Sequence, residues 1–251
     1  NSKTDFEILL PRLLNHMLIK ATHWQNLYEV YKKQAGIDLN KAQVKKFRSI
    51  EDSNEFEIGD LTCLVGKNEA GKTAVLQSLY GLKPFKEYEF DKIRDYPRRF
   101  LSKYDQDNTD GESEVIRTWW KLEQSDLDKV NEDFFEDIIT NDLIEVSAGI
   151  GYSGTRWEVS INEADYVSHL LTKHKLDATE RSQLKNIKTT QNLGKAIDAL
   201  EAQTEKQMAL RKEITTHRKD RVILSVIDIL SKNMPSFFYT SHYDRMAGEI
   251  S

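Results

Sequence analysis

The segment Gly66–Thr73, which reads GKNEAGKT, constrains this chain of 251 residues more than any other feature. It fits the spacing G-x-x-x-x-G-K-[ST] at every position. A short apolar run, Leu61–Val65, precedes the segment, and a helical pattern that ends in glycine, Ala74–Gly81, follows it. The order of strand, glycine-rich turn and helix predicts an α/β fold, with the turn at the end of a central buried strand.

This spacing suits the binding of phosphate. Glycines let the backbone curl so that successive amide groups point inward, and the following helix directs its N-terminal amides at the same charge. Lys72 can reach the β- and γ-phosphates, and the Thr73 hydroxyl can bind Mg²⁺. A glycine turn that binds nothing is disfavoured by the flanking strand and helix patterns. The sequence therefore predicts a site for ATP and Mg²⁺ at Gly66, Lys67, Asn68, Glu69, Ala70, Gly71, Lys72, Thr73 and Ala74.

The pattern along the chain predicts three segments. Residues 1–39 carry a helical apolar stripe, residues 40–163 hold the phosphate loop with several strand patterns, and residues 164–251 read as a helical arm followed by a return strand. Strands are expected at Val115–Leu122 and in a hairpin around Gly151, which form an antiparallel β lobe beside a mixed sheet. The expected architecture is α/β with an antiparallel β lobe and a helical arm.

Composition excludes several classes of protein. No run approaches the roughly 20 apolar residues that span a bilayer, so neither a membrane protein nor a membrane partner is expected. The N-terminus lacks a secretion signal, and the lone Cys63 suits the reducing cytoplasm with a buried packing role. A net charge of −5 disfavours a generally basic nucleic-acid binder. The first residue, Asn1, is not Met, which suggests a piece of a longer protein.

The phosphate loop and its flanks resemble the ABC-type heads of SMC-like and RecF-like ATPases. The resemblance rests on Lys46–Asp52, with sequence KFRSIED, and on Phe56–Leu76. Glu69-Ala70, Asp95–Phe100 and Phe238–Asp244 are similar to ATPases of the overcoming-lysogenization-defect (OLD) group, which includes ATPase subunits of bacterial anti-phage systems. The close match covers about residues 42–85 and implies the N-terminal lobe of such a head.

The resemblance implies roles for further residues. Asn68 would lie near the γ-phosphate, and Arg48 and Ser49 would approach the nucleotide from the first strands. The segment 164–251 would begin a dimerisation insertion. The implied function is ATP-dependent dimerisation that controls DNA processing or anti-phage defence. Implied partners are a second ATPase head, as a homo-oligomer, and DNA or a nuclease or effector subunit.

The sequence also departs from the pattern of such heads. An acidic pair should end an apolar strand, but the nearest match, Ile223–Asp228, suits a helix better. Met246–Glu249 only faintly resembles the signature loop, and Gln106 has nothing beyond proximity to support it as the Q-loop glutamine. The catalytic residues are therefore unassigned. We expect ATP binding here, with hydrolysis dependent on residues outside the chain and on a partner head.

Other functions remain as alternatives. The first is a scaffold subunit that nucleotide holds together without turnover. A GTPase would need an N-K-x-D guanine reader, and Thr172–Asp177 is not one. Arg94, Arg98 and Arg99 suit either the lid of a kinase or a basic patch. A calcium loop at Asp105–Gly111 is disfavoured because Arg117 stands where glutamate is required. The six histidines lack the spacing of zinc ligands.

Overall fold

The computed structural model describes residues 37–67 and 70–239. The helical stripe expected within residues 1–39 lies almost wholly outside these ranges, as do Asn68, Glu69 and Met246–Glu249. Within the described residues, no helix combines the length and the apolar content needed to cross a membrane.

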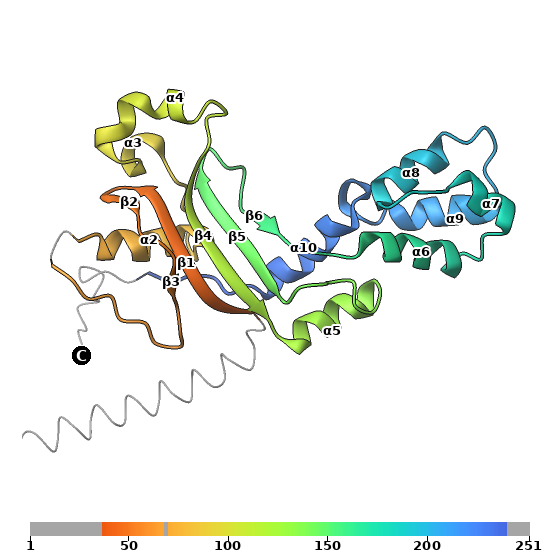
Figure 1. Ribbon diagram of the computed structural model, residues 1–251, viewed down its shortest axis with the longest axis horizontal. Coiled ribbons are helices and arrows are strands. Elements are labelled where there is room, and N and C mark those ends of the chain that lie inside the picture. The colour runs from red at the N-terminus through yellow and green to blue at the C-terminus, as the bar shows by residue number, and fades with distance from the viewer. Residues whose placement is uncertain (1–36, 68–69, 240–251) are drawn as a thin grey trace, which may run out of the picture. The chain divides into compact units, whose positions relative to one another are not determined.

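One antiparallel sheet contains the strands of the described residues. Its order is β2–β1–β4–β5–β6, and β3 pairs with β1 beside β2 (Figure 1). The strands are β1 (Ile37–Phe47), β2 (Ile50–Asp52), β3 (Phe56–Glu57), β4 (Ser113–Leu122), β5 (Leu143–Ile150) and β6 (Arg156–Glu158). The predicted strand at Val115–Leu122 and the predicted hairpin around Gly151 are confirmed as β4 and as β5 with β6.

The central strand β4 shows why this part of the sequence forms a sheet. Ile116, Thr118, Trp120 and Leu122 alternate along it and are buried. The buried Thr118 hydroxyl donates to the Val146 carbonyl of β5 at 2.6 Å and accepts from the Trp120 indole at 2.8 Å. The polar atoms of this core are therefore paired, as burial requires.

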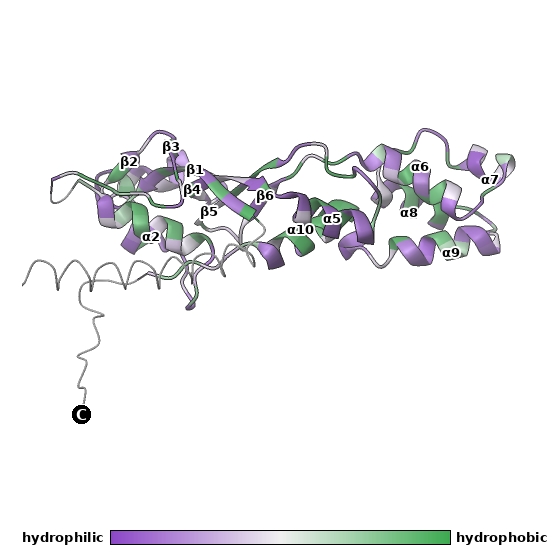
Figure 2. Cartoon of the chain, turned by 90° about the horizontal axis from the view of Figure 1, so that it is seen from below, coloured by the Kyte–Doolittle hydropathy of each residue, from purple (hydrophilic) through white to green (hydrophobic). Residues whose placement is uncertain are grey.

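Helix α2 (Lys72–Leu82) covers one face of the sheet, where it packs on β1, β4 and β5 (Figure 2). Its buried residues are Ala74, Ser78 and Leu82. They recur every four positions and so lie on one side of the helix. The predicted helix after the phosphate loop is confirmed, and its N-terminus lies at the loop.

The second half of the chain is a cluster of short helices rather than one extended arm (Figure 1). Side-chain caps from Asn162, Asp177, Thr189 and Thr204 begin four of them, so the chain turns repeatedly. Leu170, Leu193, Ile197, Leu210 and Ile214 are buried among them. The helices are α6 (Glu163–Lys173), α7 (Ala178–Gln183), α8 (Thr190–Asp198), α9 (Glu205–Ile214), η2 (Arg218–Asp220) and α10 (Val222–Asn233).

Helix α10 returns the chain to the sheet-containing part. It packs on α5 (Gln124–Asp133), and the Lys83 ammonium donates to the carbonyls of Ser231 and Met234 at its C-terminal end. After α10, the expected return strand is a single parallel bridge between Phe237 and Pro84. Three short helices, α3 (Lys92–Asp95), η1 (Arg98–Lys103) and α4 (Tyr104–Asp107), lie between α2 and β4.

Three expectations about the strand before the phosphate loop are wrong. Leu61–Val65 is not in a strand, Leu61 and Val65 are 93% and 89% exposed, and Cys63 is exposed rather than packed. The described sheet is antiparallel rather than mixed. A central buried strand needs a partner on each edge, and the described strands pair with one another rather than with this segment. The apolar pattern alone could not supply those partners.

Candidate functional site

The phosphate loop turns into α2 at Gly71, which has a φ of +88°. This left-handed conformation favours glycine. A Cβ added there would lie 3.0 Å from Cγ1 of Ile50 and 3.4 Å from Oγ of Ser49, so the loop approaches the β1–β2 turn closely. Glycine suits both the positive φ and the close approach, which accounts for the last glycine of the motif.

The start of α2 presents unpaired donors. The first amides of a helix have no partner within the helix. Gly71, the residue before α2, has no side chain that could cap these amides. The first turn of the helix also contains no acidic residue. The Lys72 ammonium donates to the carbonyls of Gly66 at 2.6 Å and Lys67 at 2.7 Å. The loop thus curls around the lysine, with its positive charge beside the helix N-terminus.

An open pocket of about 420 Å³ lies at this end of α2. Its lining combines residues that are far apart in the sequence: Arg48, Ser49, Gly71, Lys72, Thr73, Ala74 and Gln77. The predicted residues Arg48 and Ser49 therefore lie with the second half of the motif. Gly66, Lys67 and Ala70 lie in the exposed part of the loop outside this lining, and Asn68 and Glu69 fall outside the described residues.

The lining of the pocket includes groups that could bind a triphosphate and Mg²⁺. Lys72 and Arg48 supply positive charge, and the N-terminal amides of α2 supply donors for phosphate oxygens. The Thr73 hydroxyl could serve as one oxygen ligand of a magnesium ion whose other ligands would be phosphate oxygens and water. Among the residues that the structure describes, no group of three His, Cys, Asp or Glu side chains is arranged to hold a metal.

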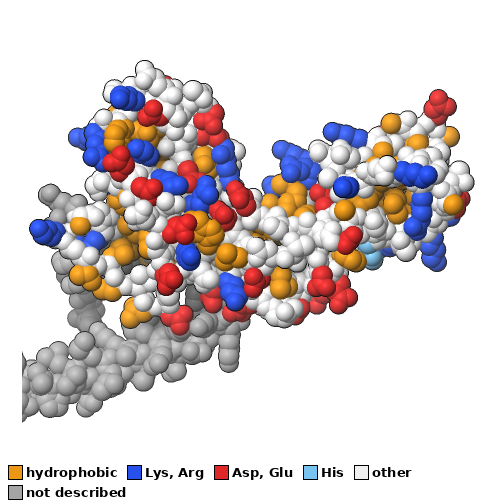
Figure 3. Space-filling view, in the orientation of Figure 1, with side chains coloured by type: hydrophobic (Ala, Val, Ile, Leu, Met, Phe, Trp, Pro, Cys, Tyr) orange, Lys and Arg blue, Asp and Glu red, His pale blue; other side chains and the backbone are white. Residues whose placement is uncertain are grey.

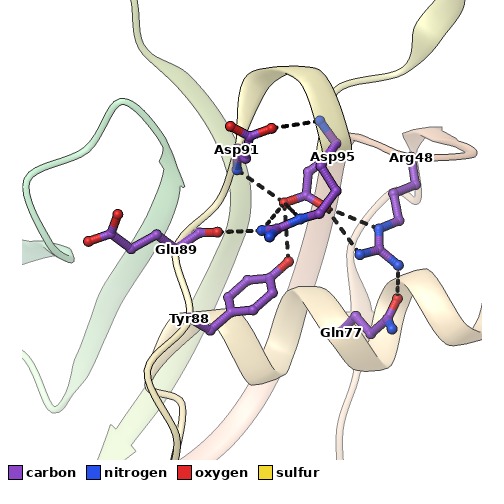
Figure 4. Close-up of polar contacts among 7 residues, drawn as sticks. Arg48, Gln77, Tyr88, Glu89, Asp91 and Asp95 are labelled. Atoms are coloured by element: carbon purple, nitrogen blue, oxygen red, sulfur yellow. Dashed lines mark hydrogen bonds and ion pairs between the residues drawn. The ribbon is translucent and has the colours of Figure 1, made fainter.

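Arg48 reaches the pocket from the turn after β1. Its backbone has a φ of +51°, and its amide donates to the Asp95 carbonyl oxygen at 2.6 Å. Its guanidinium donates to Asp95 Oδ1 from Nε at 3.2 Å and from Nη2 at 3.1 Å, and from Nη1 to Gln77 Oε1 (Figure 4). Arg48 thus connects the carboxylate at the end of α3 with helix α2.

Asp95 is completely buried, and several donors surround its carboxylate. Arg94 donates from Nη2 to Oδ2 at 2.7 Å, the Asp91 amide donates at 3.1 Å and the Tyr88 hydroxyl at 3.2 Å. Burial favours the neutral acid, but the hydrogen bonds from Arg94, the Asp91 amide and Arg48 outweigh it and hold the pKa of Asp95 below its ordinary value. Asp95 is therefore an ionised carboxylate inside the protein.

The arginines noted in the sequence have different environments. Arg94 is bound to Asp95, and Arg99 donates to Glu51 at 2.6 Å. Lys and Arg side chains beside α3 and η1 lie among acidic ones rather than in a continuous basic patch (Figure 3).

Gln106 is exposed on α4 and does not line the pocket. The segment Ile223–Asp228 lies in helix α10, as its spacing predicted.

The comparisons with known proteins give one distant relative. An uncharacterised protein of Methanocaldococcus jannaschii, MJECL44, is 28% identical to this chain over 110 residues. The aligned part covers 44% of this chain and only 30% of the relative's length. No protein-family model matches the chain. No solved structure matches it either.

Sequence reasoning gave no role to two residues of the site. Asp95 appeared only within a family resemblance, and Gln77 was one helical residue among others. Gln77 follows Thr73 by four positions, so it lies on the same side of α2, and this spacing could have identified it. Nothing local in the sequence indicates that Arg48 and Asp95 meet, because 47 residues separate them.

Proposed function

We propose that this chain binds Mg·ATP at the pocket formed by the phosphate loop, the start of α2 and the β1–β2 turn. The observation that carries the proposal is the convergence of Arg48, Lys72 and Thr73 on one pocket at a helix N-terminus. Two cationic side chains beside free backbone amides favour a polyanion over a neutral ligand. Thr73 would hold the magnesium ion, which supplies charge neutralisation between the phosphates.

The chain would act as the nucleotide-binding lobe of an ABC-type ATPase head of the SMC-like and OLD-like kind, in the cytoplasm. ATP would promote dimerisation with a second head, and the dimer would control DNA processing or an anti-phage effector. Lys72, Arg48 and Thr73 bind and orient the phosphates. Hydrolysis needs an oriented water and further charge stabilisation, so turnover would require groups from outside the described residues.

The test is a titration of a fluorescent ATP analogue in the presence of Mg²⁺, with light scattering to follow mass. Wild type should bind, and Lys72→Ala should lose binding. Lys103→Ala is the matched control, because Lys103 is exposed on η1 and does not line the pocket. Equal binding by wild type and Lys72→Ala, or no binding by wild type, would exclude the proposed site.

Two further readouts separate the alternatives. Preference for GTP over ATP would favour another class of phosphate-loop enzyme. Nucleotide-dependent dimers without turnover, even when a complete partner head is added, would favour a scaffold that nucleotide stabilises. ATP-dependent dimers that hydrolyse ATP only with the partner head would support the ATPase.

A further inference from the structure

We propose that Asp95 is a positioning residue of the nucleotide site: it fixes the guanidinium of Arg48 at the pocket so that the remaining N–H groups of the arginine face the phosphates. This inference rests on the proposed function and goes beyond it, because Asp95 itself does not line the pocket. It acts through Arg48 alone.

Asp95 holds Arg48 by both its backbone and its side chain. The Arg48 amide donates to the Asp95 carbonyl oxygen at 2.6 Å, and Nε and Nη2 donate to Oδ1 at 3.2 and 3.1 Å (Figure 4). Arginine is a long side chain with many rotamers, which these bonds reduce to one arrangement. A side chain held in its binding conformation before the ligand arrives loses less entropy on binding.

The bonds to the protein leave part of the guanidinium free. Arginine has five N–H donors. Two of them donate to Asp95 and one to Gln77, which leaves two, one on each terminal nitrogen. The Arg48 side chain is 33% exposed, and it is the part of this cluster that lines the pocket together with Lys72 and Thr73. The free donors are therefore available to a ligand in the pocket.

The charge of the cluster also suits this role. Arg48 and Arg94 share the single carboxylate of Asp95, so the three groups together carry one net positive charge. Arg94 does not line the pocket. Its Nη2 donates to the Glu89 carbonyl oxygen at 2.5 Å as well as to Asp95. Asp95 therefore fixes Arg48 without cancelling the positive charge that a phosphate meets.

Gln77 provides the second anchor, and it places the cluster in contact with the helix that begins at the phosphate loop. Its amide oxygen accepts from Nη1 of Arg48. Arg48 is thus held between the carboxylate and a residue one turn beyond Thr73. Removal of the Asp95 carboxylate leaves the guanidinium only this neutral bond, which does not define its orientation.

A double-mutant cycle on nucleotide affinity tests the inference. The variants are Asp95→Asn, Arg48→Ala and the two combined, titrated with the fluorescent ATP analogue and Mg²⁺. Loss of charge-assisted hydrogen bonds predicts that each single variant weakens binding by about tenfold. The combined variant should bind no more weakly than Arg48→Ala, because Asp95 acts only through that arginine. A merely structural role for Asp95 would instead weaken binding equally in both backgrounds and overturn the inference.

Asp91→Asn is the matched control, because the Asp91 carboxylate caps α3 beside Asp95 but does not contact Arg48. It should bind nucleotide as wild type does. Arg48→Lys keeps the inference testable if Asp95→Asn does not fold. Lysine retains the positive charge but lacks the planar guanidinium that Asp95 and Gln77 hold. The Arg48→Lys variant should therefore lose affinity for the nucleotide as Arg48→Ala does. Wild-type affinity in Arg48→Lys would show that charge suffices and would overturn the inference.

The two proposals fail in different ways. If wild type binds and Lys72→Ala does not, but Asp95→Asn and Arg48→Ala both bind as wild type does, the nucleotide site stands and the role of Asp95 is wrong. If wild type itself does not bind, both proposals are wrong.

Discussion

A Cβ on Gly71 would lie 3.0 Å from Cγ1 of Ile50, closer than most real side-chain contacts allow. The phosphate loop therefore meets the β1–β2 turn and Ile50 at a point where a side chain would fit only if its neighbours moved. Because Ser49 lies at the same contact, the relative position of the loop and of the turn that carries Arg48 depends on this glycine.

Gly71→Ala should therefore weaken nucleotide binding by at least tenfold. The new methyl group displaces Ile50 or the loop, and the left-handed backbone costs about 1–2 kcal/mol for a residue other than glycine. Titration with the fluorescent ATP analogue measures the effect. Gly59→Ala is the control, because a Cβ there meets nothing within 4 Å. Wild-type affinity in Gly71→Ala would contradict the close approach of loop and turn.

Gly149→Ala should destabilise the sheet without involving the nucleotide site. A Cβ at Gly149 would lie 2.1 Å from the carbonyl oxygen of Ser113, beside the register shift between β4 and β5. Because the clash is with backbone, β4 must move, and the free energy of unfolding should fall by about 1–3 kcal/mol or more. Urea denaturation measures the loss. An unchanged midpoint, equal to that of Gly59→Ala, would show that the strands are not paired in this register.

Leu230→Ala should lower the free energy of unfolding by about 2–5 kcal/mol, because it leaves a cavity in a buried site. Leu230 is fully buried on α10, which packs on α5. Met208→Ala is the control: Met208 on α9 is 50% exposed, and its loss should change stability by less than about 0.5 kcal/mol. Similar effects of the two substitutions in urea denaturation would contradict the burial of α10.

His217 should make the stability of the helical part depend on pH. It is buried, and its Nε2 lies 3.1 Å from the hydroxyl oxygen of Tyr166. Burial lowers the pKa of His217 below its ordinary value of 6.5, although Glu213, Asp220 and Glu163 oppose the shift. The unfolded chain therefore takes up a proton at a higher pH than the folded chain does. The stability from neutral His217 is present above pH 6.5 and is lost progressively as the pH falls from that value towards the lower pKa of the folded protein.

Measurement of the free energy of unfolding between pH 8 and pH 5 tests this dependence. The decline below about pH 6.5 should be smaller in His217→Gln, which retains a polar partner for Tyr166 but does not titrate. The other ionisable groups are common to both proteins, so the difference between the two curves isolates His217. Parallel curves would show that His217 titrates as it does in the unfolded chain.

The sequence predicts the parts of this protein that depend on local pattern. The loop Gly66–Thr73 and the helix after it follow from a motif whose members are neighbours in the chain. Strand β4 follows from its β-branched and aromatic residues, and the helical character of the later segment from its charged composition, although its division into several short helices was not predicted. These features need no knowledge of distant contacts.

The features that sequence reasoning missed depend on residues far apart in the chain. Leu61–Val65 has the composition of a buried strand, but partner strands decide burial, and the described sheet offers none beside it. Arg48 and Asp95 are unremarkable as single charged residues. Their contact exists because the β1–β2 turn and the end of α3 come together, which no local pattern encodes.

The contact of Lys83 with the end of α10 connects two parts of the chain that lie far apart in the sequence. Helix α2 spans 11 residues, or roughly 16 Å, from the pocket at its N-terminus to Lys83. The same helix therefore lines the pocket with its first turn and ends at the lysine that donates to Ser231 and Met234, so one element contacts both the pocket and the end of α10.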